Sequence, residues 1–193
     1  MSSRKTRFAW GPVVAVLILI VATGAITWLH ARNQTPATRP FDLIDSKSGR
    51  EVSDRNFRGK WLLVFFGYTH CPDICPTTLG EIAEKLIKLG PLADRLQPIF
   101  ITLDPKRDTQ KVIADYTAAV DPRILGLTGT PDKIADAATG YGVSYAERQL
   151  GGDYFLDHSA TIYVTRPDGT PARSFLGTAD STAMGKRLRA LLQ

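Results

Sequence analysis

The longest hydrophobic stretch of the chain lies near its N-terminus, where residues 8–29 carry no charge. As a helix, these 22 residues would rise through about 30 Å, the thickness of the hydrocarbon core of a bilayer. Trp10 and Trp28 stand near its two ends, where amphipathic rings prefer the membrane interface. The pattern therefore predicts one N-terminal transmembrane helix.

Three basic residues, Arg4, Lys5 and Arg7, precede this run. Positive charge on the short flank favours its retention in the cytoplasm, so we expect residues 1–7 to be cytoplasmic and residues 30–193 to lie outside, in the periplasm. The protein would be a single-pass protein of the inner (cytoplasmic) membrane. A cleaved signal peptide is the alternative, although its apolar region would be shorter and would end in a small-x-small site.

Beyond position 40 the hydrophobic positions follow shorter periods. Residues 61–67 are apolar on both faces and rich in aromatics, which is typical of a buried central strand. Ile82, Leu86 and Leu89 then follow with helical spacing. The remaining predicted elements are a possible hairpin at 41–45 and 49–52, strands at 98–103, 124–127, 154–156, 160–164 and 172–176, and helices at 108–120, 131–140 and 181–192.

This order of elements predicts the fold class. Alternating strands and helices form parallel units, and the turn at Arg166-Pro167-Asp168-Gly169 joins two of the last strands as an antiparallel hairpin. We therefore expect an α/β domain with a mixed sheet and flanking helices over residues 41–193. Residues 30–40 are polar and contain two prolines, as expected of a linker between membrane and domain.

The net charge becomes informative when residues 1–40 and residues 41–193 are counted separately. The formal net charge is +5, but five basic residues and no acidic ones lie in the first forty positions. From position 41 onward the chain has 19 basic and 19 acidic residues. A neutral domain beside a basic, apolar N-terminus favours a membrane contact and excludes a nucleic-acid-binding protein.

The candidate chemistry lies in the two cysteines, Cys71 and Cys75, which fall between the strand at 61–67 and the next helix. That position places both thiols at the carboxyl edge of the sheet and near a helix N-terminus, where the thiolate is favoured. If they were one helical turn apart, their Cα atoms would be about 6 Å apart, so they could form a disulfide bond or share a metal.

The spacing of three residues between the cysteines departs from the two-residue spacing of the usual thioredoxin-type motif. A purely stabilising disulfide is a weak alternative, because so small a loop restricts the unfolded chain little. Pro72 and Pro76 follow the cysteines and disfavour helical angles at the residue before each of them. We therefore expect a loop and an irregular first turn.

Four segments of the domain resemble the Sco/SenC family, the copper chaperones of cytochrome c oxidase assembly. They are residues 67–76 (Gly-Tyr-Thr-His-Cys-Pro-Asp-Ile-Cys-Pro), 103–109 (Leu-Asp-Pro-Lys-Arg-Asp-Thr), 126–131 (Gly-Leu-Thr-Gly-Thr-Pro) and 153–159 (Asp-Tyr-Phe-Leu-Asp-His-Ser). The resemblance covers residues 41–193. It implies a thioredoxin-like fold with an added β-hairpin, an N-terminal membrane anchor, and copper ligands at Cys71, Cys75 and His158.

The donor types agree with this assignment, because soft thiolates together with an imidazole select copper(I), with copper(II) as a second oxidation state. Zinc would usually take a fourth ligand.

We do not expect His70 to be a ligand, since its side chain should leave the strand on the side opposite Cys71. Asp157 is either a partner that orients His158 or a surface acid.

Asp104 and Asp108 flank Pro105. The simplest interpretation is a turn in which Asp108 caps the following helix. The alternative is a loop at the same sheet edge as the cysteines, forming part of the face that a partner meets.

Two functions of different classes remain open. The first is a metallochaperone without turnover chemistry, which would deliver copper(I) to the dinuclear copper site of an oxidase subunit. Other periplasmic copper chaperones or thiol reductants would be further partners. The second is an enzyme, a thiol-disulfide oxidoreductase that reduces the cysteines of that subunit or of another exported protein, with Cys71 and Cys75 as its catalytic redox pair. A thioredoxin-like peroxidase is a weaker third, because it needs a peroxidatic cysteine in its own pocket.

Overall fold

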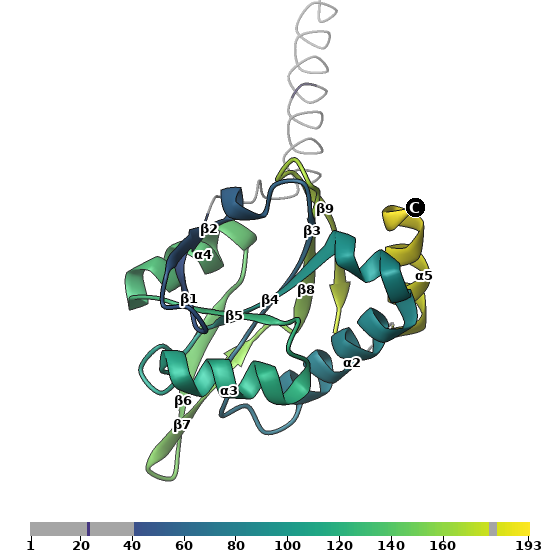
Figure 1. Ribbon diagram of the computed structural model, residues 1–193. Helices are drawn as coiled ribbons and strands as arrows, with labels where there is room; N and C mark the ends of the chain where they lie inside the picture. The colour runs from purple at the N-terminus through teal and green to yellow at the C-terminus, as the bar shows by residue number, and fades with distance from the viewer. Residues whose placement is uncertain (1–22, 24–40, 178–180) are drawn as a thin grey trace, which may run out of the picture. The chain divides into compact units, whose positions relative to one another are not determined.

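The computed structural model describes residue 23, residues 41–177 and residues 181–193 (Figure 1). Its contacts divide the chain into residues 1–35 and residues 36–193, and all described residues except residue 23 belong to the second unit. The predicted transmembrane helix and linker lie almost wholly outside the described residues. Among the described residues, no helix is both long enough and apolar enough to cross a membrane.

A seven-stranded mixed sheet forms the centre of the domain. The strand order is β2-β1-β5-β4-β3-β8-β9, with β3, β4 and β5 parallel and the remaining pairs antiparallel. The strands are β1 (Asp42–Asp45), β2 (Glu51–Ser53), β3 (Trp61–Gly67), β4 (Leu96–Thr102), β5 (Leu125–Thr128), β8 (Thr161–Thr165) and β9 (Pro171–Leu176). The predicted buried strand at 61–67 is thus confirmed as β3, in the middle of the sheet.

Four α-helices surround this sheet within the described residues (Figure 1). They are α2 (Ile74–Leu89), α3 (Gln110–Val120), α4 (Pro131–Tyr141) and α5 (Ser181–Leu192), with short 3-10 helices η1 (Asp54–Phe57) and η2 (Gly90–Arg95). Thr130 caps α4 by accepting a hydrogen bond from the Lys133 N–H, and Pro131 is the first helical residue, as predicted. The prediction that Asp108 caps the helix at 108–120 is wrong, because α3 begins later and its cap is Thr109.

Aromatic contacts show that helices cover both faces of the sheet. Phe66 of β3 lies 5.3 Å, between ring centroids, from Tyr141 of α4. Its neighbour Phe65 lies 6.2 Å from Phe100 of β4, and Phe100 lies 5.7 Å from Tyr116 of α3. Because consecutive side chains of a strand point to opposite faces, α3 and α4 lie on opposite sides. The predicted α/β architecture is therefore confirmed.

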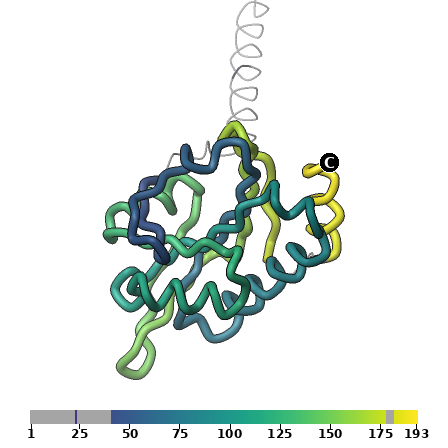
Figure 2. The backbone as a smooth tube through the Cα atoms, viewed as in Figure 1, coloured from purple at the N-terminus to yellow at the C-terminus, as the bar shows by residue number. Residues whose placement is uncertain are grey.

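A separate antiparallel hairpin joins α4 to β8 and extends away from the body of the domain (Figures 1 and 2). It consists of β6 (Tyr145–Leu150) and β7 (Asp153–His158). The sequence pattern predicted only the middle of β7, at residues 154–156. It missed β6 because all residues of that strand after Tyr145 are exposed, so no hydrophobic alternation marks it.

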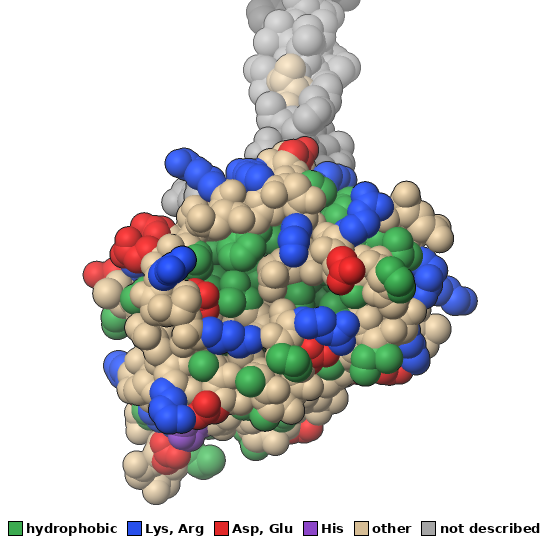
Figure 3. All heavy atoms as spheres, in the orientation of Figure 1, with side chains coloured by type: hydrophobic (Ala, Val, Ile, Leu, Met, Phe, Trp, Pro, Cys, Tyr) green, Lys and Arg blue, Asp and Glu red, His purple; other side chains and the backbone are tan. Residues whose placement is uncertain are grey.

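Charged side chains of both signs are mixed with hydrophobic ones on the face drawn in Figure 3. This distribution agrees with the balance of 19 basic and 19 acidic residues beyond position 40.

Candidate metal centre

Both cysteines lie at the carboxyl end of β3, where the chain turns into α2. Cys71 is half-buried in the loop before the helix, whereas Cys75 is fully buried in the first helical turn. The backbone N–H of Cys75 donates a hydrogen bond to the Cys71 sulfur at 3.4 Å, and the two cysteines are not joined by a disulfide bond. The predicted placement of the pair at the start of this helix is confirmed. The predicted loop is present and ends at Asp73, where φ is −139° and ψ is −63°, but the predicted irregular first turn is wrong, because α2 begins at Ile74 and includes Cys75.

Gly67, the last residue of β3, makes room for this arrangement. A Cβ atom at this position would lie 2.7 Å from the Cys75 sulfur and 2.9 Å from the Phe100 ring. Contacts this short do not occur between unstrained atoms, so a larger residue would displace the sulfur. The absence of a side chain at Gly67 is therefore part of how the strand positions Cys75.

His158 is the last residue of β7, and its side chain lies beside the sulfur of Cys75. Its Nε2 atom lies 3.6 Å from the Cys75 sulfur. Its ring meets Tyr68 edge to face, with centroids 5.8 Å apart, and Phe65 at 6.4 Å. Nδ1 lies 3.1 Å from the carbonyl oxygen of Ser159. In the tautomer with its proton on Nδ1, the ring donates to that carbonyl and its Nε2 lone pair is free to bind a metal ion; in the other tautomer, Nε2–H donates toward the sulfurs.

Together these three residues form a compact donor set. One atom from each of Cys71, Cys75 and His158 lies within 4.8 Å of the other two. Metal–sulfur and metal–nitrogen bonds of about 2.0–2.3 Å put the donors of a shared trigonal ion about 4 Å apart. The three side chains therefore need little movement to share one ion. Among the described residues, no other group of histidines, cysteines and acids meets the same distance criterion.

The two thiols differ in acidity. A hydrogen bond from the Cys75 side chain, assisted by His158, lowers the pKa of Cys71 to about 4. The same hydrogen bond and burial raise the pKa of Cys75. In the metal-free protein Cys71 is therefore the thiolate and Cys75 the thiol that donates to it. A metal ion that binds both sulfurs displaces the remaining proton.

The other two predicted candidates lie outside this set. The His70 side chain is half-exposed, and its Nδ1 atom lies 3.8 Å from a carboxylate oxygen of Asp108, away from the donor atoms, as expected. Asp157 does not orient His158. It pairs instead with Arg148 at 3.8 Å on the exposed surface of the hairpin, so the alternative of a surface acid is correct. The group beside Nδ1 of His158 is the Ser159 carbonyl.

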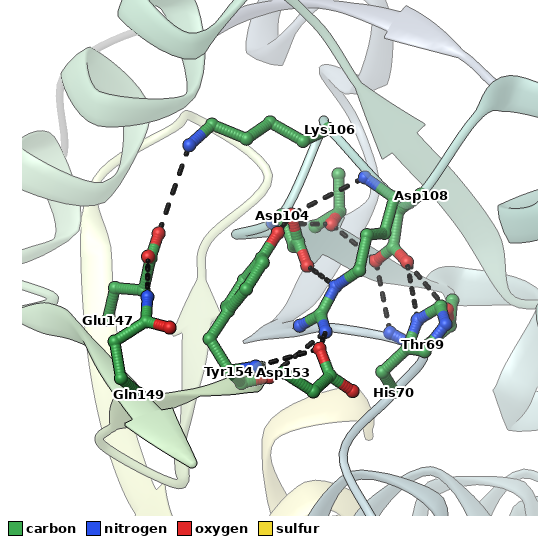
Figure 4. A network of polar contacts seen from close by, with 11 residues as sticks. Thr69, His70, Asp104, Lys106, Asp108, Glu147, Gln149, Asp153 and Tyr154 are labelled. Carbon is green, nitrogen blue, oxygen red and sulfur yellow. Dashed lines mark hydrogen bonds and ion pairs between the residues drawn. The ribbon is translucent and has the colours of Figure 1, made fainter. Parts of the chain in front are cut away.

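Asp108 has a role that the sequence did not reveal. It is fully buried and accepts hydrogen bonds from the Thr69 N–H at 3.0 Å, the Thr69 hydroxyl at 2.5 Å and the Thr102 hydroxyl at 2.6 Å (Figure 4). It thereby ties the segment that leads into Cys71 to the end of β4. The predicted alternative, that this loop lies at the same sheet edge as the cysteines, is correct.

Comparison with known proteins agrees with this geometry. The family model of SCO1/SenC matches residues 30–193. The chain belongs to the SCO1/SenC family. Over 133 residues it is 43% identical to the mitochondrial protein SCO2 homolog of Mus musculus, a match that spans 67% of this chain and 52% of that protein. The chain thus spans about half the length of the curated relatives it matches.

Two solved structures of the family are similar in fold. One is Arabidopsis thaliana ScoI with copper bound, 32% identical, with a TM-score of 0.75, covering 80% of this chain and 97% of the other. The second is Bradyrhizobium japonicum ScoI with copper bound, 41% identical, with a TM-score of 0.70, covering 78% of this chain and 98% of the other. These similarities confirm the predicted thioredoxin-like α/β fold of the described domain.

Proposed function

We propose that this protein is a copper metallochaperone that holds copper(I) between Cys71, Cys75 and His158 and delivers it to the dinuclear copper site of a cytochrome c oxidase subunit. The observation that carries the proposal is the clustering of three donor atoms within 4.8 Å. Two thiolates and one imidazole are soft donors that prefer copper(I). Solved relatives with the same fold are described with copper bound.

The arrangement of the three donors suits an ion that is transferred to another protein. Cys71 is half-buried in a loop, so incoming thiolates of a recipient have access to the ion from that side. Cys75 is fully buried, whereas His158 is half-buried like Cys71 but comes from the β6–β7 hairpin. Ligand exchange would begin at Cys71 while the other two donors retain the ion, which releases copper without leaving it free in solution.

The same proposal includes the location of the protein. Residues 8–29 would anchor it in the inner membrane, with residues 30–193 in the periplasm, where the oxidase copper site is assembled. The partners would be the copper-site subunit, other periplasmic copper chaperones and thiol reductants. A mature protein whose N-terminus lies near residue 31 would contradict the anchor.

One experiment tests the ligand set. The reduced full-length chain in detergent is titrated with copper(I) against a competing chelator, and disulfide exchange is measured on the same samples. Losing even an indirect partner of a metal ligand costs about 10–100-fold in affinity, so His158→Ala should weaken copper(I) binding at least that much and leave exchange intact. Cys75→Ala should abolish both properties, because it removes a ligand and half of the redox pair.

His70→Ala is the matched control, since it removes a histidine beside Cys71 that lies outside the donor set. It should leave copper(I) affinity unchanged. If His158→Ala bound copper(I) as tightly as the parent chain, the three-ligand site would be wrong, and His158 would act in proton transfer or partner contact.

The low pKa of Cys71 favours a second candidate, thiol-disulfide exchange. In that reaction the Cys71 thiolate attacks a substrate disulfide and releases one substrate thiolate. Cys75 then loses its proton and attacks the mixed disulfide at Cys71, which releases the second substrate thiol and leaves a Cys71–Cys75 disulfide. An external thiol reductant would return the pair to the reduced state. The main donor that lowers the pKa of Cys71 is Cys75 and not His158. Exchange should therefore largely survive in His158→Ala while copper binding falls, and the measurement separates the two functions.

A further inference from the structure

Arg107 lies in the loop 104–108 and connects this loop to the β6–β7 hairpin. Figure 4 shows its partners Asp104, Asp153 and Tyr154. Its guanidinium binds the Asp104 carboxylate within the loop. It also donates hydrogen bonds to two groups of the hairpin, the Asp153 carboxylate at 3.0 Å and the Tyr154 carbonyl oxygen at 3.0 Å. The Arg107 side chain is only 17% exposed, whereas the Asp153 side chain is 76% exposed. The bonds to Asp104 and to the Tyr154 carbonyl are therefore the ones partly shielded from solvent.

Aromatic packing strengthens the same connection. The Arg107 guanidinium carbon lies 3.7 Å from the centroid of the Tyr154 ring, which is a close cation–π contact. The Tyr154 hydroxyl donates to Asp104 at 2.9 Å. Arg107, Asp104 and Tyr154 therefore form a closed triangle of contacts that joins the loop to β7.

Besides its chain connections, the hairpin has a few further contacts with the body of the domain: Tyr145 and Leu156 pack against the core, and Lys106 pairs with Glu147 at 3.8 Å. Within the described chain, β6 and β7 pair only with each other. Only Leu156 is fully buried among the residues of the two strands. An isolated two-stranded hairpin is at best marginally stable, and His158 is its last residue. The position of the imidazole therefore depends on what holds β7.

Arg107 also lies close to the ring that packs on the imidazole. Its guanidinium carbon is 5.8 Å from the centroid of Tyr68, and Tyr68, which is only 2% exposed, meets the His158 ring edge to face. In the same loop, Asp108 holds the cysteine segment through Thr69. One loop thus contacts both of the chain segments that bring donors to the site.

We propose that Arg107 is a positioning residue, which holds the β6–β7 hairpin against the loop 104–108 and so keeps the His158 imidazole within reach of the two sulfurs. The inference rests on the proposed function, because it assumes that His158 is a copper ligand. Arg107 touches none of the donor atoms. It acts on copper binding only through His158.

A double-mutant cycle with the full-length chain tests this dependence. Copper(I) affinity is measured by chelator competition for the parent, Arg107→Ala, His158→Ala and the double variant. Arg107→Ala should weaken affinity about tenfold when His158 is present, the lower end of what indirect partners of ligands contribute. In the His158→Ala background, the same substitution should change affinity by less than about twofold, the usual limit for independent changes.

Two further variants isolate the cause. Arg123→Ala removes a similar arginine, which binds Asp121 through two nitrogens at 2.9 and 2.6 Å beyond the far end of α3, and should not alter affinity. Arg107→Lys keeps the charge but cannot bind Asp104, Asp153 and the Tyr154 carbonyl together. It should lie between the parent and Arg107→Ala, and it serves in the cycle if Arg107→Ala does not fold.

The outcomes separate this inference from the function on which it rests. If His158→Ala weakens binding and neither Arg107 variant does, the positioning role is wrong and the ligand set stands. If the Arg107 variants weaken binding equally in both backgrounds, Arg107 supports the fold in general, which also overturns the inference. If His158→Ala itself has no effect, the proposed ligand set fails and the role of Arg107 fails with it.

Discussion

Cys71 and Cys75 are four positions apart in sequence, but their surroundings differ. Cys71 is half-buried in a loop and receives hydrogen bonds from the Cys75 side chain and backbone. Cys75 is fully buried beneath β3 and His158. One thiol is therefore suited to be the accessible nucleophile or exchange point, and the other to be the retained donor.

This difference predicts how the rate of alkylation of Cys71 depends on pH. Because the pKa of Cys71 is lowered to about 4, the thiolate should persist as the pH falls and be lost only as the pH passes through that value. Alkylation of Cys71 in the reduced, copper-free protein should therefore change little between pH 7 and pH 5. A thiol with an ordinary pKa near 8.5 would slow about 100-fold over the same interval.

Mass spectrometry of the alkylated peptides measures this reactivity and distinguishes Cys71 from Cys75. Cys75→Ala removes the main donor that lowers the pKa of Cys71, so it should restore a steep dependence on pH. If alkylation of Cys71 in the parent protein slowed about 100-fold between pH 7 and pH 5, its thiolate would not be stabilised in this way.

A second prediction concerns the space that Gly67 leaves for the Cys75 sulfur. Gly67→Ala would place a Cβ atom 2.7 Å from the Cys75 sulfur. Overpacking of this kind costs about 1–3 kcal/mol of unfolding free energy, and here the atom displaced is a proposed ligand. We therefore expect both a less stable protein and weaker copper(I) binding, measured by denaturant unfolding and chelator competition.

Gly80, in the exposed face of α2, is the matched control because a Cβ atom there meets nothing within 4 Å. Gly80→Ala should leave copper binding unchanged and stabilise the protein by up to about 1 kcal/mol through helix propensity. Unchanged copper affinity in Gly67→Ala would mean that the sulfur has room to move without loss.

The start of α3 shows how two adjacent polar residues divide their roles. Thr109 caps the helix by accepting a hydrogen bond from the Val112 N–H at 3.3 Å, whereas Asp108 turns inward to Thr69 and Thr102. Thr109→Ala should cost about 1 kcal/mol of stability and leave copper(I) affinity unchanged.

Asp108→Asn should have a larger effect on stability than Thr109→Ala. The amide presents N–H groups to donors that need an acceptor, and a buried group left unsatisfied costs about 1–3 kcal/mol. Copper(I) affinity should fall as well, because the segment leading into Cys71 loses its anchor. Equal effects of the two substitutions on stability and binding would contradict the distinction.

The elements that the sequence predicted well are those whose burial leaves a pattern. The run at 61–67 is hydrophobic throughout because β3 has neighbours on both sides and helices on both faces. Strand β6 has no hydrophobic pattern in the sequence, because it is stabilised by pairing with β7 and not by burial.

The same distinction applies to the site. The cysteine pair was predictable from its place between a strand and a helix, and His158 from family resemblance. Asp108 and the Ser159 carbonyl were not, because a capping motif and an inward-facing carboxylate look alike in sequence, and a backbone acceptor has no sequence signal. The contacts of Arg107 with the hairpin span 46 and 47 positions and appear only in the folded chain.

The proposed copper site joins two segments that are far apart in the chain. Cys75 and His158 are separated by 83 positions, whereas Cys71 and Cys75 remain neighbours even when the chain is unfolded. An unfolded chain therefore keeps a two-sulfur site, and the folded chain alone offers the third donor. Copper(I) should consequently stabilise the fold mainly through His158, since only preferential binding to the native state raises stability.

Thermal unfolding with buffered copper(I) measures this contribution. At a free copper concentration 100 times the native dissociation constant, native-state binding contributes at most about 2.7 kcal/mol, less whatever the two-sulfur site of the unfolded chain binds. The upper limit corresponds to a rise in Tm of about 5–10 °C for a domain of this size. His70→Ala should show the full rise. His158→Ala should show little of it even at saturating copper, because its remaining sulfurs bind the ion in both states. A full rise in His158→Ala would mean that the two cysteines alone account for the native preference, and that the hairpin carries no ligand.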